Sequence, residues 1–331
     1  MKIMTEKLSI IISVVVSAIM LAASCGKNGV KTDGHHEVAI VPLHTYIYNV
    51  SSQLSGNSSD STGSVGAEAA ALLKTLGYEP TYTGMLDYSD SKAVKVFTPD
   101  IVNIYSDLTA ENEAINDVLT NAEAEGLKIP SNLRFATVAW GRPQSMIFCD
   151  SVLLIGLNHY LGKDYAGYAG FPEYIREQKD RRFLPYDLAE AIVATYYPYS
   201  PGEYNSVSNR LIYEGAIAYT RYILTGEDDE SGALGYDAQQ LEMLGKRRDE
   251  LQNTMIAKKL MFDSSPSVQS RLFDPSPATQ ILADGLPGRA GRYIGYMLVK
   301  DYMDRHGDMT LADILSPEFY GGRNPLESVY R

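Results

Sequence analysis

The chain has 331 residues, with 29 Lys and Arg against 41 Asp and Glu, so its formal net charge at pH 7 is −12. An acidic chain without a visible basic patch binds polyphosphates poorly, which excludes nucleic acid as the expected partner. Only two cysteines occur, Cys25 and Cys149. We therefore expect stability to come from burial of an apolar core, which a chain of this length can supply without disulfide bonds.

Residues 1–24 have the layout of a signal peptide. Lys2 and Lys7 supply the positive charge at the start, and an almost unbroken apolar run extends from Leu8 to Ala23. This run is too short to cross a hydrocarbon core of roughly 30 Å, so it is not predicted to be a membrane span. The pattern instead predicts export of the chain across a membrane.

Cys25 comes directly after small residues at positions 22–24, an arrangement similar to the bacterial lipobox, in which diacylglycerol is attached to the cysteine sulfur. The pattern predicts lipidation of Cys25 and a firm membrane anchor, since two or three acyl chains hold where a single chain is marginal. The alternative is a secreted protein in which this cysteine is incidental. Residues 25–37 are polar and glycine-containing and predict a flexible tether. The remainder, 38–331, is predicted to be a single α-rich globular domain.

The domain begins with its least regular part. A short apolar segment at 38–48 precedes a loop at 51–66 that is rich in Ser, Gly, Asn and Asp, and a helix is expected to start near Val65. A stronger pattern follows at 109–125, where helix formers carry regularly spaced apolar residues and Gly126 provides a stop. This segment is predicted to be a helix.

Three β-branched or aromatic runs predict a small meander, the only sheet expected, at 133–140, 145–148 and 152–157. Further helices are predicted at 185–197, 206–224, 237–262 and 290–306. Asp237 with Gln240 fits a side-chain cap, and Gly226 and Gly307 fit helix stops. The expected fold class is α+β and predominantly helical.

Glu214 is the most informative residue of the helix predicted at 206–224. It lies among apolar residues that would be buried, and it is followed by Gly215. An unpaired buried charge is costly, so this carboxylate requires a partner: an arginine such as Arg289 or Arg292, a backbone cap, or a metal ion.

Three blocks of sequence carry a family resemblance: LLIGLNHYLGKDY at 153–165, LIYEGA at 211–216 and PGRAGRYIGY at 287–296. In this order, behind a lipobox, they resemble the gliding-motility lipoprotein GldB family. A weaker similarity extends from about residue 97 to the C-terminus and includes FPEYI at 171–175. The resemblance implies an exported lipoprotein of Bacteroidetes, and the best-known members are needed for gliding and the linked secretion machinery.

The same blocks are also similar to a more distant group of zinc-dependent peptidases. In that group an HExxH helix supplies two histidine ligands and a catalytic glutamate, and a Glu-Gly-x-Ala helix supplies the third ligand. Glu214 stands where this third ligand would fall, which implies a zincin-like domain with a small sheet. The chain has only five histidines, however, and none lies near 187–191, where HExxH would be expected. We therefore expect a degenerate peptidase domain without catalytic residues, a bound metal or a cofactor.

The residues of the expected vestigial cleft are Glu214, His159, Asp187, Glu190, Arg289 and Arg292. The three carboxylates offer only oxygen ligands, which suit calcium or magnesium better than zinc, but ordinary surface acids are the alternative. His159 is interpreted as a ligand contact or as a hydrogen-bonded structural histidine. Arg289 and Arg292 would bind an anion or neutralise Glu214.

The sequence therefore predicts a non-catalytic scaffold or partner-binding lipoprotein of the cell envelope. It would be anchored by lipid to the inner or outer membrane, with its domain in the periplasm or at the cell surface, and its expected partners are the membrane and other envelope proteins. Two alternatives are a metal-dependent hydrolase with a carboxylate site and a glycan-binding surface lipoprotein. The second alternative rests on the 24 tyrosines, among which 165–168 and 196–199 are clustered.

Overall fold

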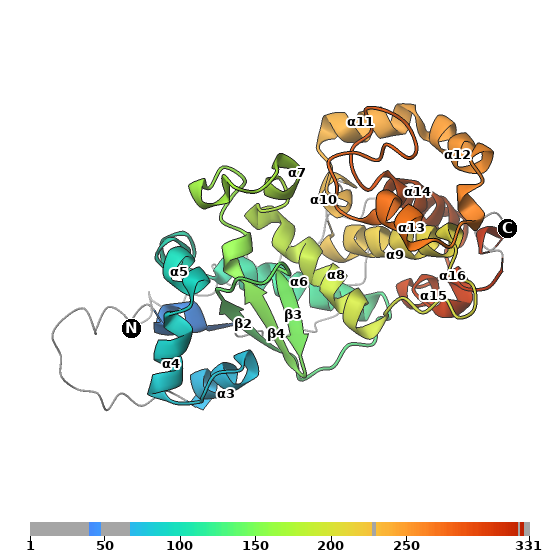
Figure 1. Ribbon diagram of the computed structural model, residues 1–331. Coiled ribbons are helices and arrows are strands. Elements are labelled where there is room, and N and C mark those ends of the chain that lie inside the picture. The colour runs from blue at the N-terminus through green and yellow to red at the C-terminus, as the bar shows by residue number, and fades with distance from the viewer. Residues whose placement is uncertain (1–39, 48–66, 227–229, 324, 328–331) are drawn as a thin grey trace, which may run out of the picture. The chain divides into compact units, whose positions relative to one another are not determined.

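The structure, a computed structural model, describes residues 40–47, 67–226, 230–323 and 325–327. The predicted signal peptide and tether, with the lipidation site Cys25, lie outside the described residues. The described residues all belong to one compact unit (Figure 1). Within the described residues, no helix combines the length and the apolar character that crossing a membrane requires.

A single four-stranded sheet is described, in the order β1-β2-β4-β3. Its strands are β1 (Ile40–Pro42), β2 (Arg134–Val138), β3 (Met146–Cys149) and β4 (Val152–Gly156). β1 and β4 pair in parallel with β2, in the registers Ile40 to Phe135 and Phe135 to Leu153, whereas β3 is antiparallel to β4. All five residues of β4 are buried, as expected of a strand with neighbours on both sides.

The predicted meander is wrong in its strand order. Only β3 and β4 form a hairpin, closed at Asp150, whose φ of 52° is the left-handed conformation that a tight hairpin turn requires. Because the loop after β2 passes beyond the position of β4, the third strand in sequence lies at the edge and the fourth lies inside the sheet. The sequence pattern does not indicate β1 as a strand, since three residues are too few for a period-2 pattern.

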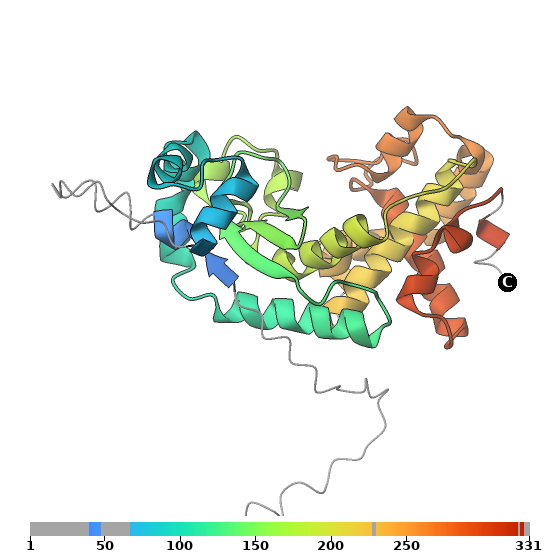
Figure 2. The same ribbon diagram turned by 90° about the horizontal axis from the view of Figure 1, so that it is seen from below.

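A helical segment at residues 43–47 and four longer helices lie between β1 and β2 in the described chain. The longer helices are α3 (Ala67–Leu76), α4 (Tyr82–Ser89), α5 (Lys92–Ile104) and α6 (Thr109–Ala124). The helix predicted at 109–125 is confirmed as α6, which lies beside the sheet and packs against the helices that follow the sheet (Figure 2). Pro99 occurs within α5, a helix that the sequence patterns did not predict.

Three long helices follow the sheet and confirm predicted segments: α8 (Leu184–Tyr196), α9 (Val207–Thr225) and α14 (Ala290–Arg305). α9 starts at a capping box formed by Ser206 and Asn209, and it ends at Gly226, whose φ is 64°. α14 ends at Arg305 with His306 as its C-cap, so Gly307 follows this helix without adopting the left-handed stop conformation.

The helix predicted at 237–262 is divided. It forms α11 (Ala238–Lys246), α12 (Arg248–Ala257) and the 3-10 helix η4 (Leu260–Phe262). Arg247 has φ −105° and ψ 8°, which interrupts the helical backbone, and Lys259 has a positive φ of 55°. The predicted cap is confirmed, because Asp237 and Gln240 form a capping box at the start of α11.

Shorter elements connect the long helices. They are η1 (Leu157–His159), η2 (Ala166–Tyr168), α7 (Glu173–Arg176), η3 (Arg181–Phe183), α10 (Glu230–Leu234), α13 (Pro266–Phe273), α15 (Leu311–Ile314) and α16 (Pro317–Tyr320).

α9 lies at the centre of the helical part and packs against α14, α8 and α6. Its contact with α14 depends on Gly215 and Gly295. A methyl group at Gly215 would lie 2.2 Å from the carbonyl carbon of Gly295, and one at Gly295 would lie 2.0 Å from the carbonyl oxygen of Leu211. These glycines therefore allow the two backbones to approach closely, as predicted for the glycines of this block.

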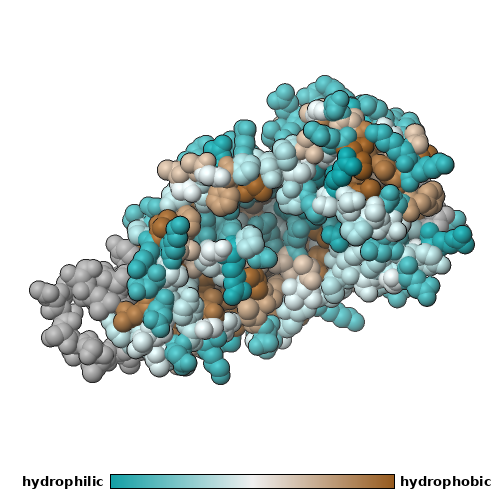
Figure 3. Space-filling model, in the orientation of Figure 1, coloured by the Kyte–Doolittle hydropathy of each residue, from teal (hydrophilic) through white to brown (hydrophobic). Residues whose placement is uncertain are grey.

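Tyrosines contribute to the core rather than to an open surface. Tyr160, Tyr168, Tyr186, Tyr296 and Tyr320 are among the largest fully buried side chains. Hydrophilic residues cover most of the face seen in Figure 3, where apolar residues form small groups. The described structure confirms a predominantly helical α+β fold with one small sheet.

Candidate functional site

A pocket of about 610 Å³ opens between the sheet end of the unit and the helices that follow. Its walls come from the loop before β3, η1, the segment from α7 to α8, the end of α10 and the loop before α14. Segments far apart in sequence therefore meet here. The pocket brings together His159, Asp187, Glu190 and Arg289 from the predicted cleft, whereas Glu214 and Arg292 do not line it.

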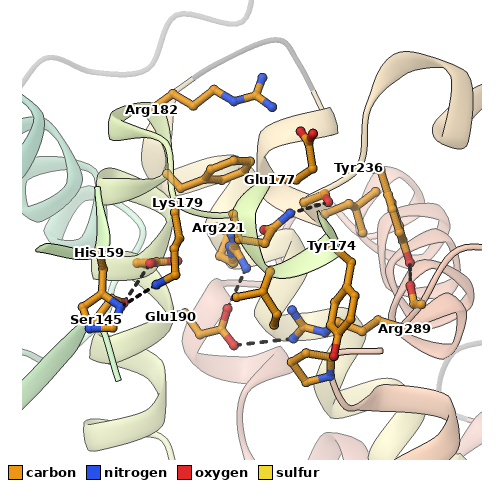
Figure 4. Close-up of a pocket in the computed structure, with 18 of the residues that line it drawn as sticks. Ser145, His159, Tyr174, Glu177, Lys179, Arg182, Glu190, Arg221, Tyr236 and Arg289 are labelled. Carbon is orange, nitrogen blue, oxygen red and sulfur yellow. Dashed lines mark hydrogen bonds and ion pairs between the residues drawn. The ribbon is translucent and has the colours of Figure 1, made fainter. Parts of the chain in front are cut away.

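His159 and Lys179 form a hydrogen-bonded pair on one wall (Figure 4). The His159 Nε2–H donates to the carbonyl oxygen of Arg142 at 3.0 Å, and Lys179 Nζ donates to His159 Nδ1 at 3.0 Å. Burial, reinforced by the charge of Lys179, lowers the pKa of His159 to about 4. His159 is thus a neutral acceptor for a cationic lysine at neutral pH, which makes it a hydrogen-bonded histidine at the edge of the pocket.

Lys179 is only 8% exposed. Its ammonium group lies 5.1 Å from the ring centre of Tyr168 and 5.0 Å from that of Phe171, within the range of cation–π attraction. Burial lowers the pKa of Lys179, and the nearby carboxylate of Asp187 opposes this effect. Sequence patterns did not single out Lys179, because it lies in an irregular segment between two helices.

Asp187 accepts two hydrogen bonds on one oxygen. Ser145 Oγ donates to Asp187 Oδ2 at 2.9 Å, and the Tyr160 hydroxyl donates to the same atom at 2.7 Å. Burial raises the pKa of Asp187 despite the opposing charge of Arg221. The two donors are the residue before β3 and the residue after η1, so this carboxylate links α8 to the sheet and to the turn that follows it.

Glu190 lies at the floor of the pocket, where its carboxylate meets two arginines. Arg221 Nη1 lies 2.6 Å from Oε2, while Arg292 reaches both oxygens, with Nη2 at 2.7 Å from Oε1 and Nη1 at 3.1 Å from Oε2. Burial raises the pKa of Glu190, but the charges of Arg292 and Arg221 outweigh that effect and hold the pKa well below its usual range. Glu190 is therefore ionised and fully committed to ion pairs.

Glu214 completes the network beneath the pocket. Its Oε2 accepts from Arg292 Nε at 2.9 Å, and its Oε1 accepts from Arg210 Nη2 at 2.5 Å. Arg292 is 1% exposed and joins Glu190 of α8 to Glu214 of α9. The ion-pair interpretation of Glu214 is thus confirmed for Arg292.

Arg289 does not neutralise Glu214. Its Nε donates to the carbonyl oxygen of Phe273 at 3.1 Å, and its closest carboxylate is Glu190, with 3.9 Å between Nη2 and Oε1. Figure 4 shows Arg221 and Arg289 both close to the carboxylate of Glu190. Arg221 was not predicted, although its spacing of seven residues from Glu214 places both on one face of α9.

The three carboxylates considered for a calcium or magnesium site do not converge. Among residues 40–47, 67–226, 230–323 and 325–327, no group of three or more His, Cys, Asp or Glu side chains is arranged to hold a metal ion. Glu190 and Glu214 face arginine guanidinium groups, and Asp187 faces hydroxyl groups.

The two tyrosine clusters considered for glycan binding are turned largely inward. Tyr168 is buried, Tyr165 is half-buried and its hydroxyl donates to Asp100 at 2.5 Å. Tyr196 packs edge-on against Phe148. Neither cluster presents the open row of rings that would favour a glycan platform.

Comparison with known proteins gives one match. The family model described as gliding motility protein GldB matches residues 42–320, which begins well before the core of about 97–331 expected from the motifs. No curated protein and no solved structure gives a match. Because the family model covers most of the chain, the protein belongs to the gliding motility protein GldB family.

Proposed function

We propose that this protein is a lipid-anchored component of a cell-envelope complex that binds a partner without catalysing a reaction on it. Membership of the GldB family supports an envelope lipoprotein related to gliding motility. The lipobox-like segment before Cys25 supports the anchor. The pocket supports binding, because its volume lies in the range of small-molecule sites, about 300–1,000 Å³.

The observation that carries the non-catalytic part is the contact of Arg292 with Glu190 and Glu214. In the zinc peptidases that the sequence distantly resembles, the corresponding helices hold metal ligands. Here a guanidinium joins a carboxylate of α8 to one of α9 at 2.7 and 2.9 Å. A guanidinium neutralises carboxylates, but its protons are fixed and it cannot activate a bound water as a metal ion does. We interpret the domain as a zincin-like scaffold in which Arg292 lies between the carboxylates of α8 and α9.

The first test measures metal content and peptidase activity of the full chain purified in detergent. After equilibration with zinc and with calcium, we expect no stoichiometric metal by plasma emission spectrometry and no cleavage of a peptide library. Glu214→Gln serves as the matched variant. Metal-dependent cleavage by the parent chain that is lost in Glu214→Gln would overturn the proposal in favour of a hydrolase.

The anchor is tested separately with Cys25→Ser. We expect this variant to lose incorporation of a labelled fatty acid and to leave the membrane fraction, since a single thioether carries the proposed diacylglycerol. Cys149→Ser is the control and should retain both properties, because Cys149 lies within the folded unit at the end of β3. Unchanged labelling of Cys25→Ser would contradict the anchor.

A further inference from the structure

We infer that the pocket binds an oxyanion, the carboxylate or phosphate group of an organic ligand, between Arg289 at its floor and Lys179 on its wall. This inference rests on the proposed function, since it names the ligand chemistry of the same pocket.

The charged groups around Glu190, at the floor of the pocket and beneath it, carry an excess of positive charge, in contrast to the chain as a whole. The chain carries −12, yet the cluster of Lys179, Arg210, Arg221, Arg289 and Arg292 faces only three carboxylates. Those carboxylates belong to Asp187, Glu190 and Glu214, which leaves an excess of two positive charges beside and beneath the cavity. Since charge that is poorly compensated in a low-dielectric site is costly, the pocket is poised to accept an anion.

The two acidic residues at the mouth of the pocket, Glu177 and Asp237, both have partners and therefore repel an anion only weakly. Glu177 pairs with Lys163 at 3.4 Å, and Asp237 caps α11 through the backbone of Gln240. Arg182 lies at the same opening (Figure 4), and its guanidinium lies 4.6 Å from the ring centre of Phe183. An incoming anion therefore meets paired acids and one further cation.

Arg289 has donors left for a ligand. A guanidinium carries five N–H donors, and within the described residues only Nε of Arg289 makes a hydrogen bond, to Phe273. Its Nη2 forms a long ion pair with Glu190 Oε1 at 3.9 Å, beyond hydrogen-bond distance, so its Nη donors are still open to a ligand. Burial and the neighbouring charge of Arg292 lower the pKa of Arg289, and the carboxylates of Glu190 and Glu214 oppose this effect only in part.

The backbone around Arg289 holds its side chain at the pocket. Arg289 has φ 62° and ψ 24°, a left-handed conformation that is uncommon for a residue with a side chain and that clusters at ligand sites. Gly288 packs so closely that a methyl group there would lie 1.8 Å from the carbonyl oxygen of Ser276. The hydroxyl of Tyr236 also donates to the carbonyl oxygen of Gly288 at 2.9 Å. The loop before α14 is thus fixed by its surroundings.

Lys179 offers the second cation. Among the residues that the structure describes, its ammonium group donates one hydrogen bond, to His159 Nδ1, and an ammonium carries three N–H donors. The rest of the lining includes Tyr174, Ile175, Tyr236 and Pro287, which are rings and apolar groups. A cavity of about 610 Å³ with such walls suits an organic ligand that carries the oxyanion rather than a bare inorganic ion.

The test titrates the full chain in detergent by calorimetry with three probes. These are an N-acetylated tetrapeptide with a free C-terminal carboxylate, the same peptide as its C-terminal amide, and inorganic phosphate. We expect the acid to bind at least about tenfold more tightly than the amide, because hydrogen bonds to charged groups account for differences of this size. Phosphate binding in place of the acid peptide would identify phosphate as the oxyanion.

Arg289→Gln and Lys179→Met are each expected to weaken binding of the preferred probe about tenfold or more. Arg289→Lys, which keeps the charge, should retain part of it. Arg134→Gln removes the same charge from an exposed position in β2 and should bind as the parent chain does. Circular dichroism of each variant identifies any that fails to fold, and the acid-against-amide comparison on the parent chain needs no variant.

The outcomes separate this inference from the proposed function. If neither acid nor phosphate binds, or if the amide binds equally well, the inference is overturned while the non-catalytic proposal stands. Mass spectrometry of the recovered peptide tests the non-catalytic proposal. A peptide that binds and is cleaved would overturn that proposal and leave the oxyanion site in place. Binding with recovery of the intact peptide supports both.

Discussion

Arg292, at the contact between α9 and α14, and Arg289, at the pocket, have opposite environments. Beneath the pocket, Arg292 is 1% exposed and its guanidinium is matched by Glu190 and Glu214. At the pocket, 24% of the Arg289 side chain is exposed; within the described residues only its Nε is hydrogen-bonded, and its ion pair with Glu190 is long, at 3.9 Å. The two arginines are three residues apart in sequence. Arg292 completes a network of ion pairs, whereas Arg289 keeps N–H donors that are not hydrogen-bonded within the described residues. The difference separates a group that stabilises the fold from one available to a ligand.

Arg292→Met should have the largest effect on stability. It leaves two carboxylates without their shared partner, and breaking a buried ion network in this way costs about 3–5 kcal/mol. Urea denaturation followed by circular dichroism measures the free energy of unfolding. Adding Glu190→Gln and Glu214→Gln to Arg292→Met should recover part of the loss. A loss below about 1 kcal/mol in the single variant would mean that the network does not hold the helices.

The pH dependence of stability should come next in size. The pKa of His159 is lowered from 6.5 to about 4 in the folded protein, so between these values the unfolded chain binds a proton that the folded chain does not. The free energy of unfolding should therefore fall as the pH is lowered from 6.5 to 4, by up to about 3 kcal/mol for this group. His44, whose pKa burial also lowers to about 4, contributes in the same direction. In His159→Gln the slope over this range should be visibly shallower, and an unchanged slope would contradict the assignment.

Gly295→Ala should separate α9 from α14. The added methyl group would lie 2.0 Å from the carbonyl oxygen of Leu211, so one helix must shift, at a cost of about 1–3 kcal/mol. Gly307→Ala is the matched control, because nothing lies within 4 Å of a methyl group there. Thermal unfolding of both variants provides the comparison. Equal melting temperatures would show that the close approach of the helices is not needed.

Arg289→Gln should have the smallest effect on stability. It removes one hydrogen bond to Phe273 and relieves repulsion from Arg292, so we expect a change within about 1 kcal/mol in the same urea experiment. Arg289→Gln is thus expected to lose ligand binding with little change in stability, whereas Arg292→Met is expected to lose stability. A destabilisation as large as that of Arg292→Met would remove the distinction between the two arginines.

Elements with their own local signals were predicted well. The helices now seen as α6, α8, α9 and α14 follow from apolar periodicity, and the Asp237 cap follows from its spacing to Gln240. The order of the strands was predicted wrongly, because pairing between β2 and β4 is set by packing between distant segments. The break at Arg247 has no proline or capping signal and was likewise missed.

The candidate site was only partly predictable for the same reason. Glu214 stood out because a carboxylate within an apolar helix face needs a partner, and Arg292 was among the partners considered. The sequence by itself therefore determined the helical class, the need to neutralise Glu214 and the family. Only the tertiary structure decided that Arg292, and not Arg289, meets that need, and that Lys179 and Arg221 join the pocket. These pairings depend on distances between groups brought together by packing, and no periodicity along the chain encodes such distances.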